Sequence, residues 1–178
     1  MNARNEDVYW LEELNRVITQ ELPKLLADPS QWDSLIVNRR KPHTYRAFHL
    51  FENGTRVCLH RFETCSSAEA FEHPHPWPGA FTVLEGEYIM TVAKSFDLYA
   101  PSEHALITKL TAGSTYAISD PLTWHSVQPL TTCYSIMVNG QPFQHPHSAA
   151  PTTKGKDLDK FTTEDLHAHL NKFKELLS

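Results

Sequence analysis

The stretch that decides the fold is 71-FEHPHPWPGAFTVLEGEY-88, in which two histidines lie two residues apart and each is followed by a proline. Proline holds its own φ near the extended value and pushes the residue before it toward an extended conformation. Because side chains two residues apart on a strand point to the same face, we expect His73 and His75 to share one face. Two imidazoles on one face form half of a metal site, and the alternative is a proline-rich surface loop with incidental histidines.

Most of the chain after residue 35 consists of short apolar or alternating runs that are separated by turn residues, a pattern typical of an all-β sandwich or barrel. The predicted strands are residues 35–37, 45–51, 56–62, 80–85, 88–93, 104–110, 114–119 and 134–138. Asn53-Gly54 lies between two of these strands and predicts a hairpin, since both residues tolerate a positive φ. Residues 139–157 are rich in proline, glycine, serine and threonine and predict a loop, which includes a second His-Pro-His at 145–147.

Both ends of the chain have the spacing of helices. Apolar residues recur every three to four positions over residues 7–27, and Pro23 is predicted to break or kink this first helix. Residues 162–177 predict an amphipathic helix with a threonine cap, and its apolar stripe consists of Leu166, Leu170, Phe173 and Leu177.

Length and charge narrow the class of protein. The 178 residues predict one domain over 1–178, with a barrel core over 28–140 and helical extensions over 1–27 and 160–178. A net charge of -5 argues against a nucleic-acid binder, and the chain contains no apolar run long enough for a membrane span. The N-terminus lacks the apolar core of a signal peptide, and three cysteines without metal-site spacing favour a reduced, cytoplasmic protein.

The histidine pair and the segment after it resemble the first motif of the cupin superfamily, a His-x-His followed by an apolar strand and a glycine-containing turn, here 83-VLEG-86. The second cupin motif ends in a third histidine on a later strand, and here 119-SDPLTWHSV-127 supplies that residue. The resemblance implies an all-β cupin barrel (a double-stranded β-helix or jelly roll) whose metal ligands are His73, His75 and His125.

Many cupins have an acidic ligand seven residues before the turn glycine, and this chain has Gly79 there. A site of three neutral histidines resembles the thiol dioxygenases of the cysteine dioxygenase branch, which use iron and add both oxygen atoms to a thiol to give a sulfinate. The stretches 28-DPSQW-32 and 44-TYRAF-48 also resemble that family. This resemblance implies that Arg46 holds the substrate carboxylate with a forked pair of hydrogen bonds. A surface salt bridge is the alternative for Arg46, and Arg56 and Arg61 are rival anchors.

Trp77 and Trp124 lie next to the metal motifs and, with Met137, are candidate pocket residues, for which core packing is the alternative. We expect Fe(II) as the cofactor, with Zn, Ni or Mn as alternatives, and a small molecule and O2 as the partners. The terminal helices either cover the barrel or form a homodimer. The competing functions are another metal-dependent reaction, such as that of a diol dioxygenase or a sugar-acid isomerase, and non-catalytic binding of a small ligand.

Overall fold

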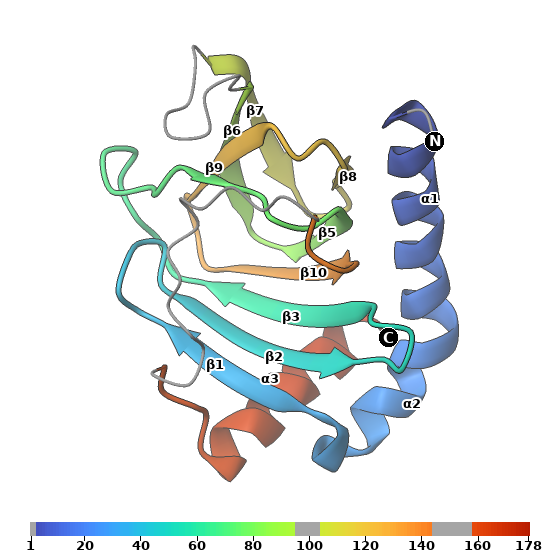
Figure 1. Cartoon of the computed structure of the whole chain (residues 1–178). Helices are drawn as coiled ribbons and strands as arrows, with labels where there is room; N and C mark the ends of the chain where they lie inside the picture. Colours follow the sequence, from blue (N-terminus) through green and yellow to red (C-terminus); the bar gives the residue numbers. More distant parts are fainter. Residues whose placement is uncertain (1–2, 95–103, 144–157) are drawn as a thin grey trace.

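The computed structural model describes residues 3–94, 104–143 and 158–178, and in this part of the chain ten strands form two sheets (Figure 1). The six-stranded sheet has the order β1-β2-β3-β10-β5-β8, and the four-stranded sheet has the order β4-β9-β6-β7. The strands are β1 (Asp33–Val37), β2 (Thr44–Leu50), β3 (Arg56–Phe62), β4 (His73–Pro74), β5 (Gly79–Glu85), β6 (Glu87–Lys94), β7 (His104–Thr111), β8 (Thr115–Ile118), β9 (Thr123–Pro129) and β10 (Cys133–Asn139).

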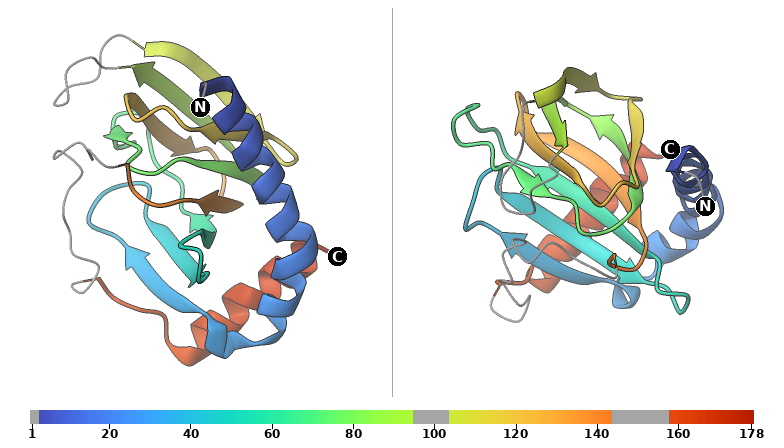
Figure 2. Two further views of the ribbon diagram at one scale, coloured as in Figure 1. Left: turned by 45° about the vertical axis from the view of Figure 1, so that its right-hand side comes forward. Right: turned by 45° about the horizontal axis from the view of Figure 1, so that its top comes forward.

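The two sheets pack against each other through apolar side chains. Val83 on β5 and Cys133 on β10 belong to one buried cluster with Tyr88 and Met90 on β6 and Val127 on β9. No ladder of backbone hydrogen bonds joins the two sheets within the described residues, so the predicted closed barrel is not found there. The sheets contact through side chains rather than through backbone pairing, and the arrangement is that of two facing layers (Figure 2).

The sequence predicted eight of these ten strands. The turn between β2 and β3 contains Asn53-Gly54 as expected, with Gly54 at a φ of 81°, and the turn between β5 and β6 contains Gly86 at a φ of 85°. The two strands that were not among the predicted runs are β4 and β9, which carry His73 and His125; the His-Pro-His spacing and the cupin resemblance had implied extended structure at both places. In β9 nearly every residue is buried, so the strand has no solvent-facing side and its sequence shows no alternation. The second His-Pro-His lies outside the described residues.

Of the two predicted effects of Pro23, a break does not occur, because the chain remains helical from Ala3 to Ala27, but the helix is irregular just before the proline. It passes from α1 (Ala3–Arg16) through a π-helical turn, η1 (Val17–Glu21), into α2 (Leu22–Ala27). The wider turn accommodates the missing N–H and the bulk of the proline ring at the start of α2.

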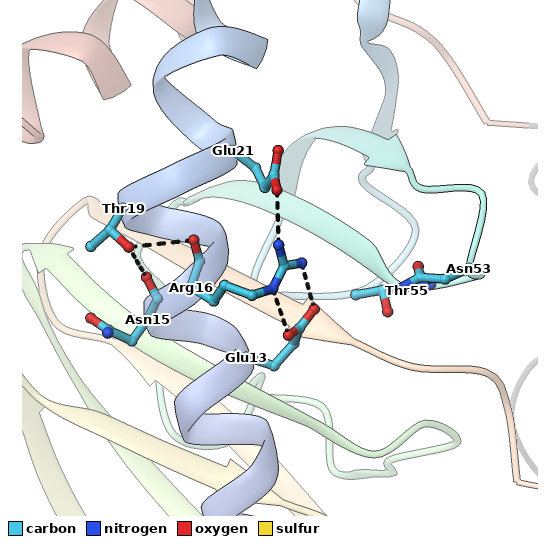
Figure 3. Close-up of polar contacts among 7 residues, drawn as sticks. All are labelled: Glu13, Asn15, Arg16, Thr19, Glu21, Asn53 and Thr55. Carbon is cyan, nitrogen blue, oxygen red and sulfur yellow. Dashed lines mark hydrogen bonds and ion pairs between the residues drawn. The ribbon is translucent and has the colours of Figure 1, made fainter.

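Polar side chains support this widened turn (Figure 3). The Arg16 guanidinium donates hydrogen bonds to Glu13 and to Glu21 at 2.8 Å, and it thereby links α1 to the end of η1. Thr19 Oγ1 donates to the carbonyl oxygen of Asn15, also at 2.8 Å.

The helices cover the face of the six-stranded sheet that is turned away from the other sheet (Figure 1). A short 3-10 helix, η2 (Pro29–Gln31), leads from α2 to β1, and α3 (Thr163–Leu176) begins at the predicted cap Thr162. Leu170 and Phe173 of α3 are fully buried against Ile136 and Val138 of β10. Since side chains alternate along a strand, the intervening residues of β10 face the space between the sheets, where the candidate site lies. No helix among the described residues is both long enough and apolar enough to cross a membrane.

Candidate metal centre

Pairing of β4 with β9 brings two of the predicted ligands together. His73 is the register partner of His125 in this antiparallel pair, and their ring centroids are 4.6 Å apart. Directly opposite residues of an antiparallel pair share a face, so both side chains point into the space between the sheets. Strand pairing therefore joins residues that are about fifty positions apart in the sequence.

His75 reaches the same place from just beyond the end of β4. Its backbone N–H donates to the carbonyl oxygen of Thr123 at 3.2 Å, which continues the extended path. The His75 ring lies 5.2 Å from the His125 ring, centroid to centroid. Both histidines of the His-Pro-His motif thus contact His125, as expected for residues on one face, and Pro74 between them faces the opposite way beside Trp124.

Backbone carbonyls orient two of the three imidazoles. Nδ1 of His73 lies 3.1 Å from the carbonyl oxygen of Phe71, and Nδ1 of His75 lies 2.6 Å from that of Trp77. A carbonyl oxygen only accepts, so Nδ1 carries the proton in each ring and Nε2 keeps its lone pair. The same arrangement orients the histidine ligands of metal sites in general.

Burial keeps all three imidazoles neutral. Loss of hydration lowers the pKa of His73, lowers that of His75 to about 3 and lowers that of His125 well below its usual value. Both ring nitrogens of His125 are buried without a hydrogen-bond partner within the described residues. A buried polar atom without a partner is costly, and a ligand that accepts the electron pair of the unprotonated nitrogen would remove the cost at that nitrogen.

These side chains fit a metal ion by their chemistry, although their geometry is incomplete. Within the described residues, no group of three His, Cys, Asp or Glu side chains could hold a metal ion as it stands. Two imidazoles bound to one ion through nitrogens at about 2.1 Å have ring centroids roughly 4.5–5.5 Å apart. The spacings of 4.6 and 5.2 Å observed for two of the three pairs lie in this range, so the rings would need to rotate rather than move apart.

Gly79 leaves no room for a carboxylate where many cupins have one. A Cβ atom at Gly79 would lie 2.6 Å from the carbonyl oxygen of Val138 and 2.9 Å from Cβ of Asn139. Asn139 is the register partner of Gly79 and is 1% exposed. The close approach of β5 to β10 thus requires glycine here, and no side chain at this position can complete the histidine site.

Arg46 extends from β2 into the same interior. Its Nε donates to Nε2 of His60 at 2.7 Å, and the two residues are register partners on β2 and β3. Burial lowers the pKa of Arg46 and lowers that of His60 well below its usual value, so His60 is a neutral acceptor. The charge of Arg46 also contributes to the lowered pKa of His73 and of His75, after the larger effect of burial.

The two rival arginines differ in orientation. Arg61 lies on the opposite face of β3 from His60, and its guanidinium is 3.9 Å from the centre of the Tyr45 ring. It therefore does not reach the three candidate metal ligands. Arg56 shares the inner face with His60. Its Nε donates to Oδ1 of Asn139 at 3.3 Å, and its guanidinium lies 4.9 Å from the centre of the Trp77 ring. Sequence reasoning named Arg56 as a rival anchor but had no signal for Asn139 as its partner.

The three predicted pocket residues are placed differently. Trp77 lies at the site, because its ring contacts that of His75 edge to face at 6.1 Å. Met137 packs in a buried cluster with Phe81, whose ring lies 5.3 Å from that of His75. Trp124 is the register partner of Pro74, and it takes the opposite face of β9 from His125.

Two surface hollows are not lined by any of the three candidate metal ligands. One, of about 250 Å³, lies between the outer face of the six-stranded sheet and α3, where Arg61 and His169 line it. The other is an open depression of about 610 Å³ around Arg40 and Phe71. Arg40 packs 4.0 Å from the centre of the Phe71 ring, and that ring stacks on His73, so this depression borders the site without including it.

Comparison with known proteins identifies the fold. No protein-family model matches the chain, and no curated protein sequence matches it either. Among solved structures, the Fe(II) form of HppE, a cupin-fold iron enzyme, is similar with a TM-score of 0.51 and 16% identity over 63% of this chain and 58% of that one. The alignment thus spans less than two thirds of the length of HppE.

Two further solved structures have lower scores. Hydroxypropylphosphonic acid epoxidase from S. wedmorenis has a TM-score of 0.49 and 15% identity, over 63% of this chain and 56% of that one. An RmlC-like cupin from Shewanella frigidimarina NCIMB 400 has a TM-score of 0.45 and 20% identity, over 63% of this chain and 86% of that one. The likeness to HppE shows a cupin-like fold, and at this identity it shows the fold alone.

Proposed function

We propose that the protein is a mononuclear non-haem iron dioxygenase that oxidises a small thiol carboxylate to a sulfinate. The observation that carries this proposal is the convergence of three neutral imidazoles and a buried guanidinium in one interior. Neutral ligands leave the full charge of a bound divalent ion in place, and that charge favours an anionic substrate.

His73, His75 and His125 would hold the metal, since all three are neutral and two present Nε2 toward the interior. Divalent iron bound there would supply a redox-active Lewis acid that favours the thiolate form of the substrate and reacts with O2. The carbonyl oxygens of Phe71 and Trp77 hold two of the rings by their Nδ1 protons, which fixes the direction of their lone pairs.

Arg46 would bind the substrate carboxylate. Its Nε is already bonded to His60, so the guanidinium is held in one orientation and its two Nη groups are left to form a forked pair of hydrogen bonds. An anchor that is fixed before binding reduces the entropy that is lost on aligning the thiol with the metal. Neutral His60 can accept from Arg46 without adding a competing negative charge.

Apolar side chains enclose this arrangement. Phe81, Met137 and Ile118 form a buried cluster on the inner face of the six-stranded sheet, and the Phe81 ring contacts His75 and lies 6.3 Å from the His125 ring. Such a wall excludes water and strengthens the interaction of the guanidinium with a carboxylate.

The test is oxygen uptake by the iron-loaded protein with a panel of small thiols, with the sulfinate product identified by its mass. We expect uptake that depends on one class of thiol carboxylate, that disappears in His75→Ala, and that requires a much higher substrate concentration in Arg46→Gln. An alcohol of the same shape in place of the thiol serves as the substrate control. Bound iron without uptake for any thiol would refute the proposal.

A second candidate is non-catalytic binding of a small anion. The observation that favours it is the absence, among the described residues, of a group of three side chains ready to hold a metal as they stand. The metal content of the purified protein distinguishes the two candidates. Stoichiometric iron supports oxygen chemistry, and anion binding by a metal-free protein supports the second candidate.

A further inference from the structure

The space between the sheets contains a second arginine that forms no ion pair with a carboxylate of the described residues. Arg56 lies on the same face of β3 as His60, and its Nη2 is buried without a hydrogen-bond partner within the described residues. The ion pairs of the described residues include neither Arg46 nor Arg56. A buried charge without a partner costs free energy unless a ligand supplies the opposite charge.

The two guanidiniums act on the same interior groups. Arg46 is the register partner of His60 on the adjacent strands β2 and β3, and Arg56 lies four residues before His60 on the same face of β3. The nearby Cys58 thiol is buried, which raises its pKa and keeps it neutral. Two positive charges therefore face a space in which the imidazoles and the thiol carry none.

Arg56 is held in position much as Arg46 is. Its Nε donates to Oδ1 of Asn139, while Nδ2 of Asn139 donates to the carbonyl oxygen of Gly140 at 3.0 Å. The second bond fixes which end of the amide faces the arginine. The Trp77 ring packs against the guanidinium. Asn139 occupies the space that a side chain at residue 79 would take, so the same contact that removes the acidic ligand also positions this arginine.

We propose that the substrate is a dianion, in which Arg46 binds one carboxylate and Arg56 binds a second. This inference rests on the proposed function for the identity of the reacting group, while the requirement for two anionic groups follows from the two arginines alone. A charge-assisted hydrogen bond to a buried guanidinium contributes enough for about a 10- to 100-fold preference over a ligand that lacks one carboxylate.

The experiment compares 2-mercaptosuccinate with 3-mercaptopropionate, two thiols that differ by one carboxylate, in oxygen uptake by the iron-loaded protein. We expect kcat/KM to be about 10- to 100-fold higher for the dicarboxylate and expect Arg56→Gln to remove most of this ratio. Arg61→Gln is the matched control, because it removes an arginine from the opposite face of the same strand. Arg56→Lys keeps a positive charge and should retain part of the preference, and it serves if Arg56→Gln does not fold.

Calorimetric titration with succinate and with propionate, on the same iron-loaded protein, separates the two proposals. If no thiol is oxidised but succinate binds more tightly than propionate in an Arg56-dependent way, the dioxygenase proposal fails and the dianion inference stands. A different result would overturn the dianion inference and leave the dioxygenase proposal standing. In that result thiols are oxidised, but the preference for the dicarboxylate over the monocarboxylate is the same in the wild type and in Arg56→Gln, both in oxygen uptake and in calorimetry.

Discussion

Acid should destabilise this protein through His169, a buried histidine of α3 that is separate from the candidate metal centre. Its Nε2 lies 3.1 Å from the carbonyl oxygen of Leu59, and its ring packs between those of Phe161 and Phe173. Burial lowers the pKa of His169 to about 4, from a usual value of 6.5. The unfolded chain therefore takes up a proton as the pH falls below 6.5, while the folded chain does not.

The sign and the size of the effect follow from these two pKa values. The contribution to stability is intact above pH 6.5 and is lost progressively as the pH falls toward 4. At pH 5 the loss from this residue alone is about 2 kcal/mol, and below pH 4 it approaches about 3 kcal/mol. A loss of this size is a large part of the total free energy of unfolding of an ordinary domain.

The assay is urea unfolding at pH 7 and at pH 5 for the wild type, for His169→Gln and for His167→Gln. Glutamine can still donate to the Leu59 carbonyl but does not titrate, so the loss between the two pH values should shrink by about 2 kcal/mol in His169→Gln. His167 is exposed on the same helix, and its replacement should leave the loss unchanged. Equal pH dependence in the wild type and in His169→Gln would refute the reasoning, and a chelator in all samples keeps metal binding out of the comparison.

Three further predictions concern the stability of the folded protein. Gly79→Ala should lower the free energy of unfolding by about 1–3 kcal/mol, since its Cβ would lie 2.6 Å from the Val138 carbonyl oxygen; a change below about 0.5 kcal/mol in urea unfolding would contradict that contact. Thr162→Ala should cost about 1 kcal/mol, because the Thr162 hydroxyl accepts from the backbone N–H of Asp165 at 3.1 Å, and retention of the cap in Thr162→Ser is the control. Fe(II) at about 100 times its Kd should raise stability by about 2.7 kcal/mol, seen as a higher melting temperature that a chelator reverses. A rise that persists in His125→Gln would place the metal elsewhere.

The elements that sequence patterns predicted are those with a local physical cause. Short apolar or alternating runs separated by turn residues predicted eight strands, including β5 and β10, which are buried along most of their length. Asn53-Gly54 predicted its hairpin because the turn needs a positive φ, and Gly54 has one. The stripe of α3 predicted which side chains would be buried, and Leu170 and Phe173 are.

The failures have tertiary causes. The widened turn η1 allows the helix to continue through Pro23. The residues before a proline do not show whether the helical turn there will widen. β9 shows no alternation because both of its faces are covered, so neither it nor β4 could be predicted from periodicity. The strand spacing was compatible with a sandwich or a barrel, and the resemblance to cupins favoured the barrel, whereas the described residues form two sheets that meet through side chains.

The sequence by itself determined the local half of the candidate site. The spacing of His73 and His75 and the prolines beside them place two imidazoles on one face, since the period of a strand is two residues. It also determined that Gly79 supplies no carboxylate, whereas Arg46 was named only by the resemblance to the thiol dioxygenases, with Arg56 and Arg61 as rivals.

Only the tertiary structure decided which distant residues meet this pair. Pairing of β4 with β9 places His125 opposite His73, and pairing of β2 with β3 places His60 beside Arg46. The position of Asn139, which takes the space beside Gly79 and orients Arg56, is likewise a consequence of how closely β5 approaches β10. Strand register depends on how whole sheets bury their apolar faces, and this is a property of the complete fold that no short segment contains.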